Sequence, residues 1–249
     1  MKLFFADLHI HTALSPCAEN EMTPPAIIKA AKAEGLDIIG ISDHNSAENV
    51  VAAIEAGAAE GVTVIGGIEV QTVEDVHVLT FFPCVDTLFR WQDEVYSALP
   101  DIENDEKRFG EQLLMDSNGN VTGKLRTFLL ASTSMSVDYV GKRVRELGGL
   151  VIPAHIDRPS FSLIRNLGFV PDTLLPCCVE ISKNTSSGSA KERFSSIVGL
   201  PVIKSSDAHR LSEISAYTEI LMEEASWEEL LLALAFVGGR SIRPLDIVC

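Results

Sequence analysis

The sequence predicts an α/β fold with a mainly parallel sheet, either open or closed into a barrel. Short apolar runs recur along the chain, and stretches with helical periodicity separate most of them. Near-continuous apolar runs are typical of strands buried on both faces. Their alternation with helices is typical of βα units. The 249 residues, 46% of them hydrophobic, suffice for one substantial core in a single domain.

The apolar runs give the expected strands in chain order. They are Leu3–Leu8, Asp37–Ser42, Thr63–Ile68, Val76–Phe82, Leu150–Ala154, Cys177–Ile181, Pro201–Lys204 and Thr218–Met222. The expected helices are Pro24–Glu34, Ala47–Gly61, Tyr139–Leu147, Ser189–Ile197 and Trp227–Val237. Thr23 followed by two prolines is typical of a helix start. Gly238–Cys249 is expected to form a final edge strand and tail.

One segment, Asp86–Met135, interrupts the alternation. It contains two helical stretches and the turn-rich patch Asp116–Gly123. At about 50 residues it lies at the lower limit of domain size. We therefore expect one domain over residues 1–249, with a mainly helical insertion at about 86–135.

The charge and the apolar pattern restrict the partners and the compartment. The formal net charge is −15, so bulk electrostatics do not attract phosphate backbones, and we expect no long duplex nucleic acid as a partner. We expect no membrane partner and a cytoplasmic location, because the chain shows neither a long apolar span nor an apolar run typical of a signal peptide. The five cysteines are then reduced thiols: Cys17, Cys84, Cys177, Cys178 and Cys249.

All six histidines lie at the edges of apolar runs. Together with acidic residues they form the groups Asp7-Leu-His9-Ile-His11, Ser42-Asp43-His44, Gly67-Ile-Glu69, His77, Pro153-Ala-His155 and Ser206-Asp207-Ala-His209, of which only Gly67-Ile-Glu69 lacks a histidine. Every group except His77 directly follows an expected strand, at the carboxyl end where α/β folds carry their active sites. A hairpin between the strand ending at Glu69 and the strand beginning at His77 would bring His77 to the same rim. That hairpin would be one antiparallel pair in an otherwise parallel sheet.

This distribution indicates a metal centre. Imidazole and carboxylate are ligands of Zn²⁺, Mn²⁺ and Fe²⁺. Side chains two positions apart in a strand share a face, so His9 and His11 can hold one ion, and Asp207 and His209 also lie together. A single histidine beside a strand is usually structural, but six on one rim point to ligands. Together with Glu69, the six histidines are more ligands than one tetrahedral ion can take, so we expect two or three ions.

This ordered series of motifs resembles the PHP (polymerase and histidinol phosphatase) superfamily. It runs D-x-H-x-H-T, S-D-H, G-x-E, a single His, P-A-H and S-D-x-H, from Lys2 to about Tyr217 apart from the interrupting segment. The resemblance implies a distorted (β/α)7 TIM-like barrel with three metal ions on its carboxyl rim. It also implies hydrolysis of phosphoesters.

The resemblance implies three ligand sets. They are His9, His11, Glu69 and Asp207 for the first ion, a bridging Glu69 with His77 and His155 for the second, and His44, His209 and Cys17 for the third. The family commonly has histidine at the position of Cys17. The Cys17 thiolate is therefore either a ligand that biases metal choice or a small buried residue that leaves the third site weak or empty.

Further residues on the rim are expected to support this centre. Asp7 shares the face of His9 and is expected to orient a ligand histidine, and Glu180 has either a hydrogen-bonding or a structural role. The expected catalytic residues are Asp43, Arg158 and Lys183. Asp43 is expected to support the ligands unless a turn brings it into direct contact, while Arg158 and then Lys183 are the expected phosphate clamps.

The predicted function is a metal-dependent phosphoesterase that hydrolyses a small phosphomonoester or a short nucleotide. Metal-bound hydroxide would attack phosphorus, with two or three Zn²⁺, Mn²⁺ or Fe²⁺ ions as cofactors. One alternative is an amidohydrolase-like enzyme acting on C–N bonds. That class usually has a bridging lysine where this chain has Glu69. A non-catalytic metal-binding module is the other alternative.

Overall fold

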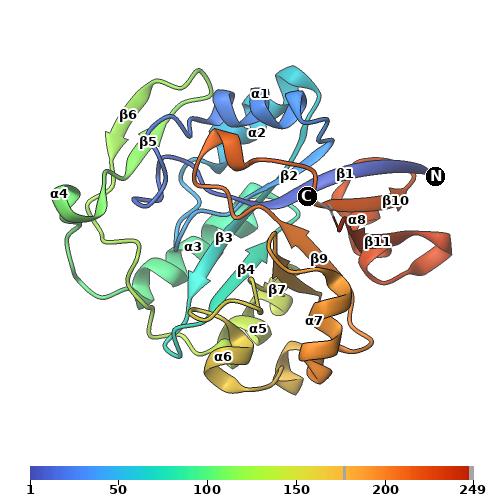
Figure 1. The fold of residues 1–249 in the computed structure, drawn as a ribbon. Coiled ribbons are helices and arrows are strands. Elements are labelled where there is room, and N and C mark those ends of the chain that lie inside the picture. Colours follow the sequence, from blue (N-terminus) through green and yellow to red (C-terminus); the bar gives the residue numbers. More distant parts are fainter. Residues whose placement is uncertain (176–177, 247–249) are drawn as a thin grey trace.

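A curled seven-stranded sheet forms the centre of the computed structural model, which describes residues 1–175 and 178–246 (Figure 1). Its strand order is β11-β10-β1-β2-β3-β4-β7. The strands are β1 (Lys2–Ile10), β2 (Ile38–Ile41), β3 (Thr63–Gln71), β4 (His77–Phe81), β7 (Leu150–Pro153), β10 (Thr218–Met222) and β11 (Ser241–Pro244). The parallel pair β8 (Val179–Ser182) and β9 (Val202–Ser205) continues the curl from β7 back to β1.

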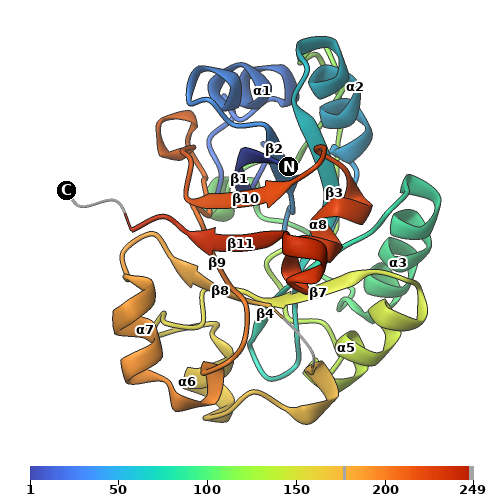
Figure 2. The same cartoon turned by 90° about the vertical axis from the view of Figure 1, so that its right-hand side faces the viewer.

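Helices surround the strands. They are α1 (Pro24–Ala33), α2 (Val50–Glu60), α3 (Val85–Ala98), α4 (Glu106–Phe109), α5 (Val137–Glu146), α6 (Leu163–Leu167), α7 (Ser187–Arg193) and α8 (Trp227–Leu234). Figure 2 shows α1, α2, α3, α5 and α7 around the outside, with β10, β11 and α8 across the end that carries the N-terminus. The predicted α/β fold is confirmed. Cys177, the first residue of one predicted strand, and Cys249 lie outside the described residues.

The pairing of β4 confirms one topological prediction and corrects another. β3 and β4 form an antiparallel hairpin that pairs Gln71 with His77, as predicted. The predictions of a mainly parallel sheet and of a single antiparallel pair are wrong. Within the described seven-stranded sheet only β1–β2 and β2–β3 are parallel, and β4 also runs antiparallel to β7, its other neighbour. The C-terminal strands add two more antiparallel pairs, since β10 returns alongside β1 and β11 returns alongside β10.

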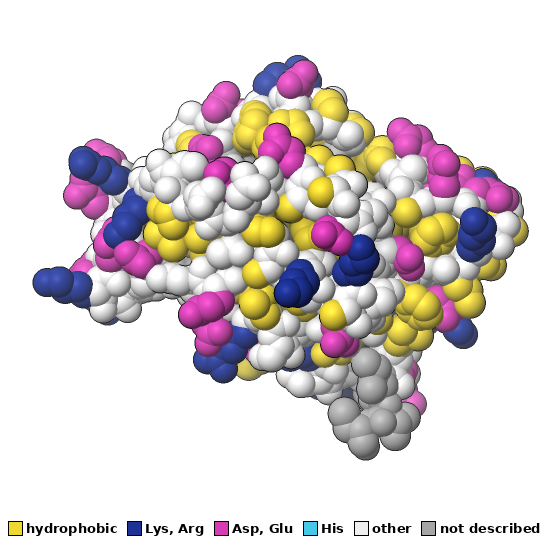
Figure 3. Space-filling view, turned by 90° about the horizontal axis from the view of Figure 1, so that it is seen from above, with side chains coloured by type: hydrophobic (Ala, Val, Ile, Leu, Met, Phe, Trp, Pro, Cys, Tyr) yellow, Lys and Arg dark blue, Asp and Glu magenta, His cyan; other side chains and the backbone are white. Residues whose placement is uncertain are grey.

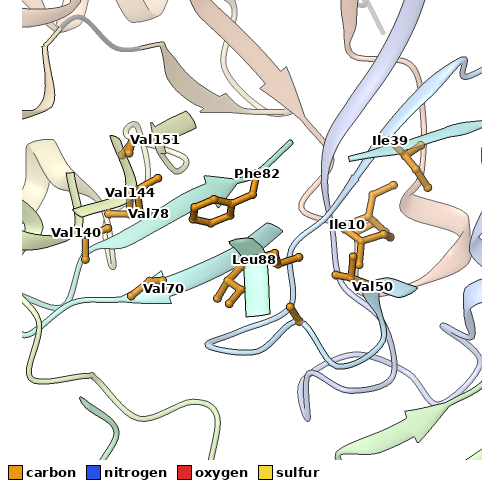
Figure 4. Packing of buried hydrophobic residues seen from close by; sticks show 14 of the residues in the cluster. Ile10, Ile39, Val50, Val70, Val78, Phe82, Leu88, Val140, Val144 and Val151 are labelled. Carbon is orange, nitrogen blue, oxygen red and sulfur yellow. The ribbon is translucent and has the colours of Figure 1, made fainter. Parts of the chain in front are cut away.

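Two apolar cores lie on the two faces of the curled sheet. The outer core joins strands and helices, and Figure 4 shows Val78 and Val151 of the sheet close to Val140 and Val144 of α5. The inner core includes Leu8 and Leu79 of the strands and is closed by Leu230 of α8. Apolar burial on both faces explains why the strands appear as near-continuous apolar runs in the sequence.

The segment at about 86–135 has two structural parts. α3 belongs to the helical layer, because its buried Leu88, Trp91 and Val95 pack in the outer core. Beyond Ala98 the chain forms α4 and the hairpin of β5 (Leu113–Met115) and β6 (Val121–Lys124), at the edge of the molecule in Figure 1. The Asn49 amide donates to the Leu113 carbonyl at 3.0 Å, which ties this hairpin to the start of α2.

The surface carries charges of both signs. Lys and Arg are interspersed with Asp and Glu over the face in Figure 3. Among the described residues, none of the helices combines the length and apolarity that a membrane crossing requires.

Candidate metal centre

A buried carboxylate, Glu69 at the end of β3, lies at the middle of a histidine cluster. Five histidines each place a ring nitrogen 2.8 to 3.4 Å from one of the two Glu69 carboxylate oxygens. They are His9, His11, His44, His77 and His155. Burial raises the pKa of Glu69, but His77, His9 and His44 outweigh burial and hold it well below its usual range. The carboxylate therefore stays ionised, as a metal ligand must.

The sixth histidine joins the cluster through His11. The ring of His209 stacks on the ring of His11, with centroids 4.3 Å apart. Three overlapping groups place their ligand atoms within 4.8 Å of one another: His9, His11 and Glu69; His44, Glu69 and His77; and His11, His44 and His209. The structure thus brings the histidines of all five histidine-bearing motifs together.

An irregularity in β1 aims His9 and His11 at the cluster. The register with β2 shifts between Asp7 and Ile10. Leu8 consequently belongs to the inner core and Ile10 to the outer core. The two ring Nε2 atoms lie 3.1 Å apart and 3.0–3.3 Å from Oδ1 of Asp207. These three side chains, with Glu69, are the set implied for the first ion.

Because of the same register shift, the expectation that Asp7 shares a face with His9 and orients a ligand histidine is wrong. The Asp7 carboxylate does not share the face of His9 and does not contact its ring. Its Oδ1 instead accepts from the backbone N–H groups of Ser206, at 2.9 Å, and of His9. Burial raises the pKa of Asp7 to about 7. Asp7 therefore holds the end of β1 against the loop that carries Asp207.

Two hydrogen-bond partners hold the Nδ1 atoms of His9 and His11. The Glu180 carboxylate lies 3.0 Å from Nδ1 of His9 and also accepts from the His155 backbone N–H. Ser15 Oγ lies 3.0 Å from Nδ1 of His11. Protons on these Nδ1 atoms leave both Nε2 lone pairs free toward the cluster. Sequence reasoning did not identify Ser15 as a partner of His11. The one feature of the sequence that indicates this role is its position four residues after His11.

Asp43 supports this arrangement from outside the cluster. Its carboxylate accepts from Thr12 N, Thr12 Oγ1 and Ser15 Oγ, each at 2.7 Å. Because Ser15 donates to Asp43, its oxygen is free to accept from the His11 ring. Asp43 thus lies two hydrogen bonds behind the His11 ring, through Ser15, and no turn brings it into direct contact with the cluster.

Cys17 lies at the edge of the cluster, hydrogen-bonded to His44 and His209. The residue as a whole is exposed, while its thiol is partly enclosed, so both alternatives for Cys17 stay predictions. Its partial enclosure raises the pKa of the thiol, but His44 and His209 outweigh this and lower the pKa to about 6. His209 Nδ1 donates to the Asp207 carbonyl at 2.9 Å, which leaves Nε2 available on the side of the sulfur.

Some buried polar atoms of the cluster are better placed to bind a metal ion than to form hydrogen bonds with one another. His44 Nδ1 and Glu69 Oε2 are 2.8 Å apart and fully buried, yet neither has a hydrogen-bond partner within the described chain. An unpartnered buried polar atom costs about 1–3 kcal/mol. A cation between such lone pairs removes that cost, so the donor set fits borderline divalent metals.

Two residues of the cluster have strained backbones. His155 and Asp207 have φ values of 29° and 50°, in the left-handed region that disfavours residues with a side chain. Each lies two residues after the end of a short strand, His155 after β7 and Asp207 after β9. Such strain is typical of functional sites, where the surrounding structure fixes an unfavourable conformation.

The two expected phosphate clamps, Arg158 and Lys183, lie at different distances from the cluster. Arg158 Nη1 is 2.5 Å from Oδ2 of Asp207, so its guanidinium directly borders the cluster. Lys183 Nζ is 3.5 Å from Glu213, whose other carboxylate oxygen accepts from the His209 backbone N–H. Lys183 is therefore one residue removed from the cluster.

Known proteins resemble this chain over almost its whole length. The uncharacterized protein YqxK of Bacillus subtilis is 26% identical over a 275-residue alignment that covers 97% of this chain and 64% of that protein. The crystal structure of the lesion-specific endonuclease PfuEndoQ from Pyrococcus furiosus superposes with a TM-score of 0.74 at 21% identity, covering 97% of this chain and 58% of that one. The chain spans less than two thirds of either protein.

A second structure overturns the expectation about duplex nucleic acid. Endonuclease Q in complex with a 27-mer duplex that carries an abasic lesion superposes with a TM-score of 0.72 at 20% identity, covering 96% of this chain and 58% of that one. A protein with this fold thus binds a long duplex at its active site. The prediction is wrong because net charge describes the whole surface and not the field at one rim.

Two family patterns match the chain directly. The PHP-associated pattern matches residues 190–236, which include α8. The PHP domain pattern matches residues 7–156, from Asp7 beside the H-x-H motif to the residue after His155. Because this match covers more than half of the sequence and includes most of the cluster, the chain belongs to the PHP domain family.

Proposed function

We propose that this chain is a metal-dependent phosphoester hydrolase. The observation that carries the proposal is the convergence of five buried histidines on Glu69, with unpartnered lone pairs on His44 and Glu69. Divalent ions bound there would activate water and neutralise phosphoryl oxygens. Two or three ions, zinc, manganese or iron, suit this donor set.

The proposed ligands follow from the contacts around Glu69 and Cys17. They are His9, His11, Glu69 and Asp207 for one ion, Glu69, His77 and His155 for another, and His44, His209 and Cys17 for a third. Glu180 and Ser15 would keep the Nδ1 protons of His9 and His11 in place and so direct the Nε2 lone pairs. Arg158 would hold a phosphate oxygen, since a guanidinium can donate to phosphate through two parallel N–H bonds.

Nucleotide phosphoesters are the proposed substrate class. The likeness to Endonuclease Q supports this class, as does the guanidinium of Arg158 beside the cluster. A nucleoside monophosphate such as AMP is the simplest member of this class.

The test measures metal content and phosphoester turnover on the same sample. Protein purified without chelator should hold two or more ions per chain and hydrolyse p-nitrophenyl phosphate, bis(p-nitrophenyl) phosphate or AMP. His77→Ala should lose this turnover while its thermal unfolding in chelator matches that of the unmodified protein. Metal without turnover of any phosphoester would refute the proposal, and turnover of a cyclic amide would identify a C–N hydrolase instead.

A further inference from the structure

One ring nitrogen of His77 faces the cluster and the other faces a glutamine. Nδ1 of His77 lies 3.0 Å from Oε1 of Glu69, on the side of the other proposed ligands. Nε2 of His77 lies 3.4 Å from Oε1 of Gln71, the last residue of β3 and the residue that pairs with His77 in the β3–β4 hairpin. Gln71 is buried, so its side-chain amide needs hydrogen-bond partners within the protein.

Asp75 and Ser132 determine which end of the Gln71 amide faces His77. The Ser132 hydroxyl donates to Oδ1 of Asp75 at 2.6 Å, so its oxygen can only accept from Gln71. The Nε2 group of Gln71 lies 2.8 Å from Ser132 Oγ and 3.2 Å from Asp75 Oδ1. Both neighbours are acceptors, so the two N–H bonds of the amide point toward them. The amide oxygen is therefore left for the His77 ring.

The amide oxygen of Gln71 selects one protonation form of the His77 ring. An amide oxygen can only accept, so it favours a proton on Nε2. A neutral imidazole carries one proton, and a metal binds the nitrogen that lacks it. A proton on Nε2 thus leaves the Nδ1 lone pair of His77 toward the cluster. His9 and His11 have the reverse arrangement, since their Nδ1 atoms are hydrogen-bonded and their Nε2 atoms meet in the cluster.

The backbone of Gln71 is held independently of its side chain. Its N–H donates to Oδ1 of Asn45 at 3.0 Å. Its carbonyl accepts from the backbone N–H and from the hydroxyl of Thr133, each at 2.8 Å. Ser132 directly precedes Thr133, so the same docking brings the Ser132 hydroxyl to the amide. A change of the Gln71 side chain can therefore remove the contact with His77 while these backbone bonds keep the neighbouring segments in place.

We propose that Gln71 is a positioning residue that holds the proton of His77 on Nε2, so that His77 binds its ion through Nδ1. Asp75 and Ser132 act behind Gln71, because they keep the amide oxygen turned toward the ring. The inference rests on the proposed function, in which His77 is a metal ligand. It adds the ligand atom of that histidine and the residue that selects it.

The first test locates the protons in zinc-loaded protein labelled with nitrogen-15 at histidine. Long-range proton–nitrogen correlation distinguishes the protonated nitrogen of each ring from the metal-bound nitrogen, and the signals missing in His77→Ala assign His77. We expect the proton of His77 on Nε2 and those of His9 and His11 on Nδ1, so one spectrum contains both patterns. A His77 proton on Nδ1, or a His77 ring without a metal bond, would overturn the inference.

The second test measures metal affinity by competition with a chromophoric chelator. Gln71→Met keeps the length of the side chain but has no acceptor oxygen, so it should weaken the ion held by His77 about 10- to 100-fold. The Gln71→Glu/Asp75→Asn double variant exchanges amide and carboxylate, so an acceptor still faces His77 and affinity should recover. Gln92→Met, at a buried glutamine of α3, is the matched control and should keep the affinity of the unmodified protein.

The outcomes separate this inference from the proposed function. Equal affinity in Gln71→Met and Gln92→Met would overturn the positioning role of Gln71. The spectrum of the unmodified protein decides the ligand atom of His77 even if the Gln71 variants do not fold. Protein that shows the expected proton pattern but turns over no phosphoester would refute the proposed function alone, since neither test needs turnover.

Discussion

Nδ1 of His9 lies 3.0 Å from Oε2 of Glu180, a residue 171 positions further along the chain. The same oxygen of Glu180 accepts from the backbone N–H of His155 at 2.9 Å. One carboxylate in β8 therefore positions the His9 ring on β1 and the backbone of His155 after β7. The geometry of the cluster therefore depends on how the curled sheet closes through β8, and not only on the clustered residues themselves.

Substitution of Glu180 by glutamine should weaken metal binding without unfolding the protein. The change keeps the size of the side chain but removes the charge that holds the Nδ1 proton of His9. We expect affinity for the first ion to fall about 10- to 100-fold, as is typical when the partner of a ligand histidine is lost. Competition with a chromophoric chelator measures this, and Glu219→Gln, remote at β10, is the control. Unchanged affinity would mean that packing alone orients His9.

Cys17→Ala should lower the number of tightly bound ions by one. The thiol contacts His44 and His209, and with its pKa lowered to about 6 it is mostly thiolate at neutral pH. Loss of the thiolate leaves that ion two histidine ligands. Metal analysis after dialysis gives the count. Cys84→Ala changes an exposed thiol away from the histidines and should keep every ion. An equal metal content in both variants would exclude Cys17 as a ligand.

The parts of this site that sequence reasoning could predict are those set by local spacing. The short turn before His77 predicted the β3–β4 hairpin, and the two-residue spacing of His9 and His11 predicted one shared face. The same spacing rule failed for Asp7, because the register shift in β1 breaks the alternation and local sequence does not reveal it. The role of Ser15 was not predictable, since it depends on Asp43 arriving from a different strand.

Gly40→Ala should destabilise the fold and weaken the metal site together. A Cβ on Gly40 would lie 2.3 Å from the Leu8 carbonyl oxygen, at the point where β2 approaches β1 below His9. The backbone of β1 must shift, at a cost of about 2–3 kcal/mol. Urea unfolding with and without metal measures both effects. Gly188→Ala, in α7 with open space around it, should be neutral or slightly stabilising. Equal stability of the two variants would contradict the close approach of β1 and β2.

Asp246→Asn should lower stability at neutral pH but not in acid. Lys204 is buried, and its Nζ lies 2.9 Å from Oδ1 of Asp246. Burial raises the pKa of Asp246, but Lys204 and Ser187 outweigh burial and lower the pKa below the ordinary value. A carboxylate whose pKa is lower in the folded state stabilises the fold above its unfolded pKa, and this stabilisation is lost as the pH falls through the folded value. Because the Asp246 side chain is 41% exposed and solvent screens the pair, we expect a loss of less than about 1 kcal/mol at neutral pH, which disappears as the pH falls through the lowered folded pKa.

Urea unfolding at the two pH values tests the effect of Asp246, and Asp101→Asn, at an exposed aspartate, is the matched control. The control should change stability little at either pH. A loss in Asp246→Asn that is equally large in acid would show that the carboxylate acts through hydrogen bonds that asparagine cannot replace, and not through the charge of Lys204. A loss confined to neutral pH would identify the pair as the electrostatic link between β9 and the C-terminal segment.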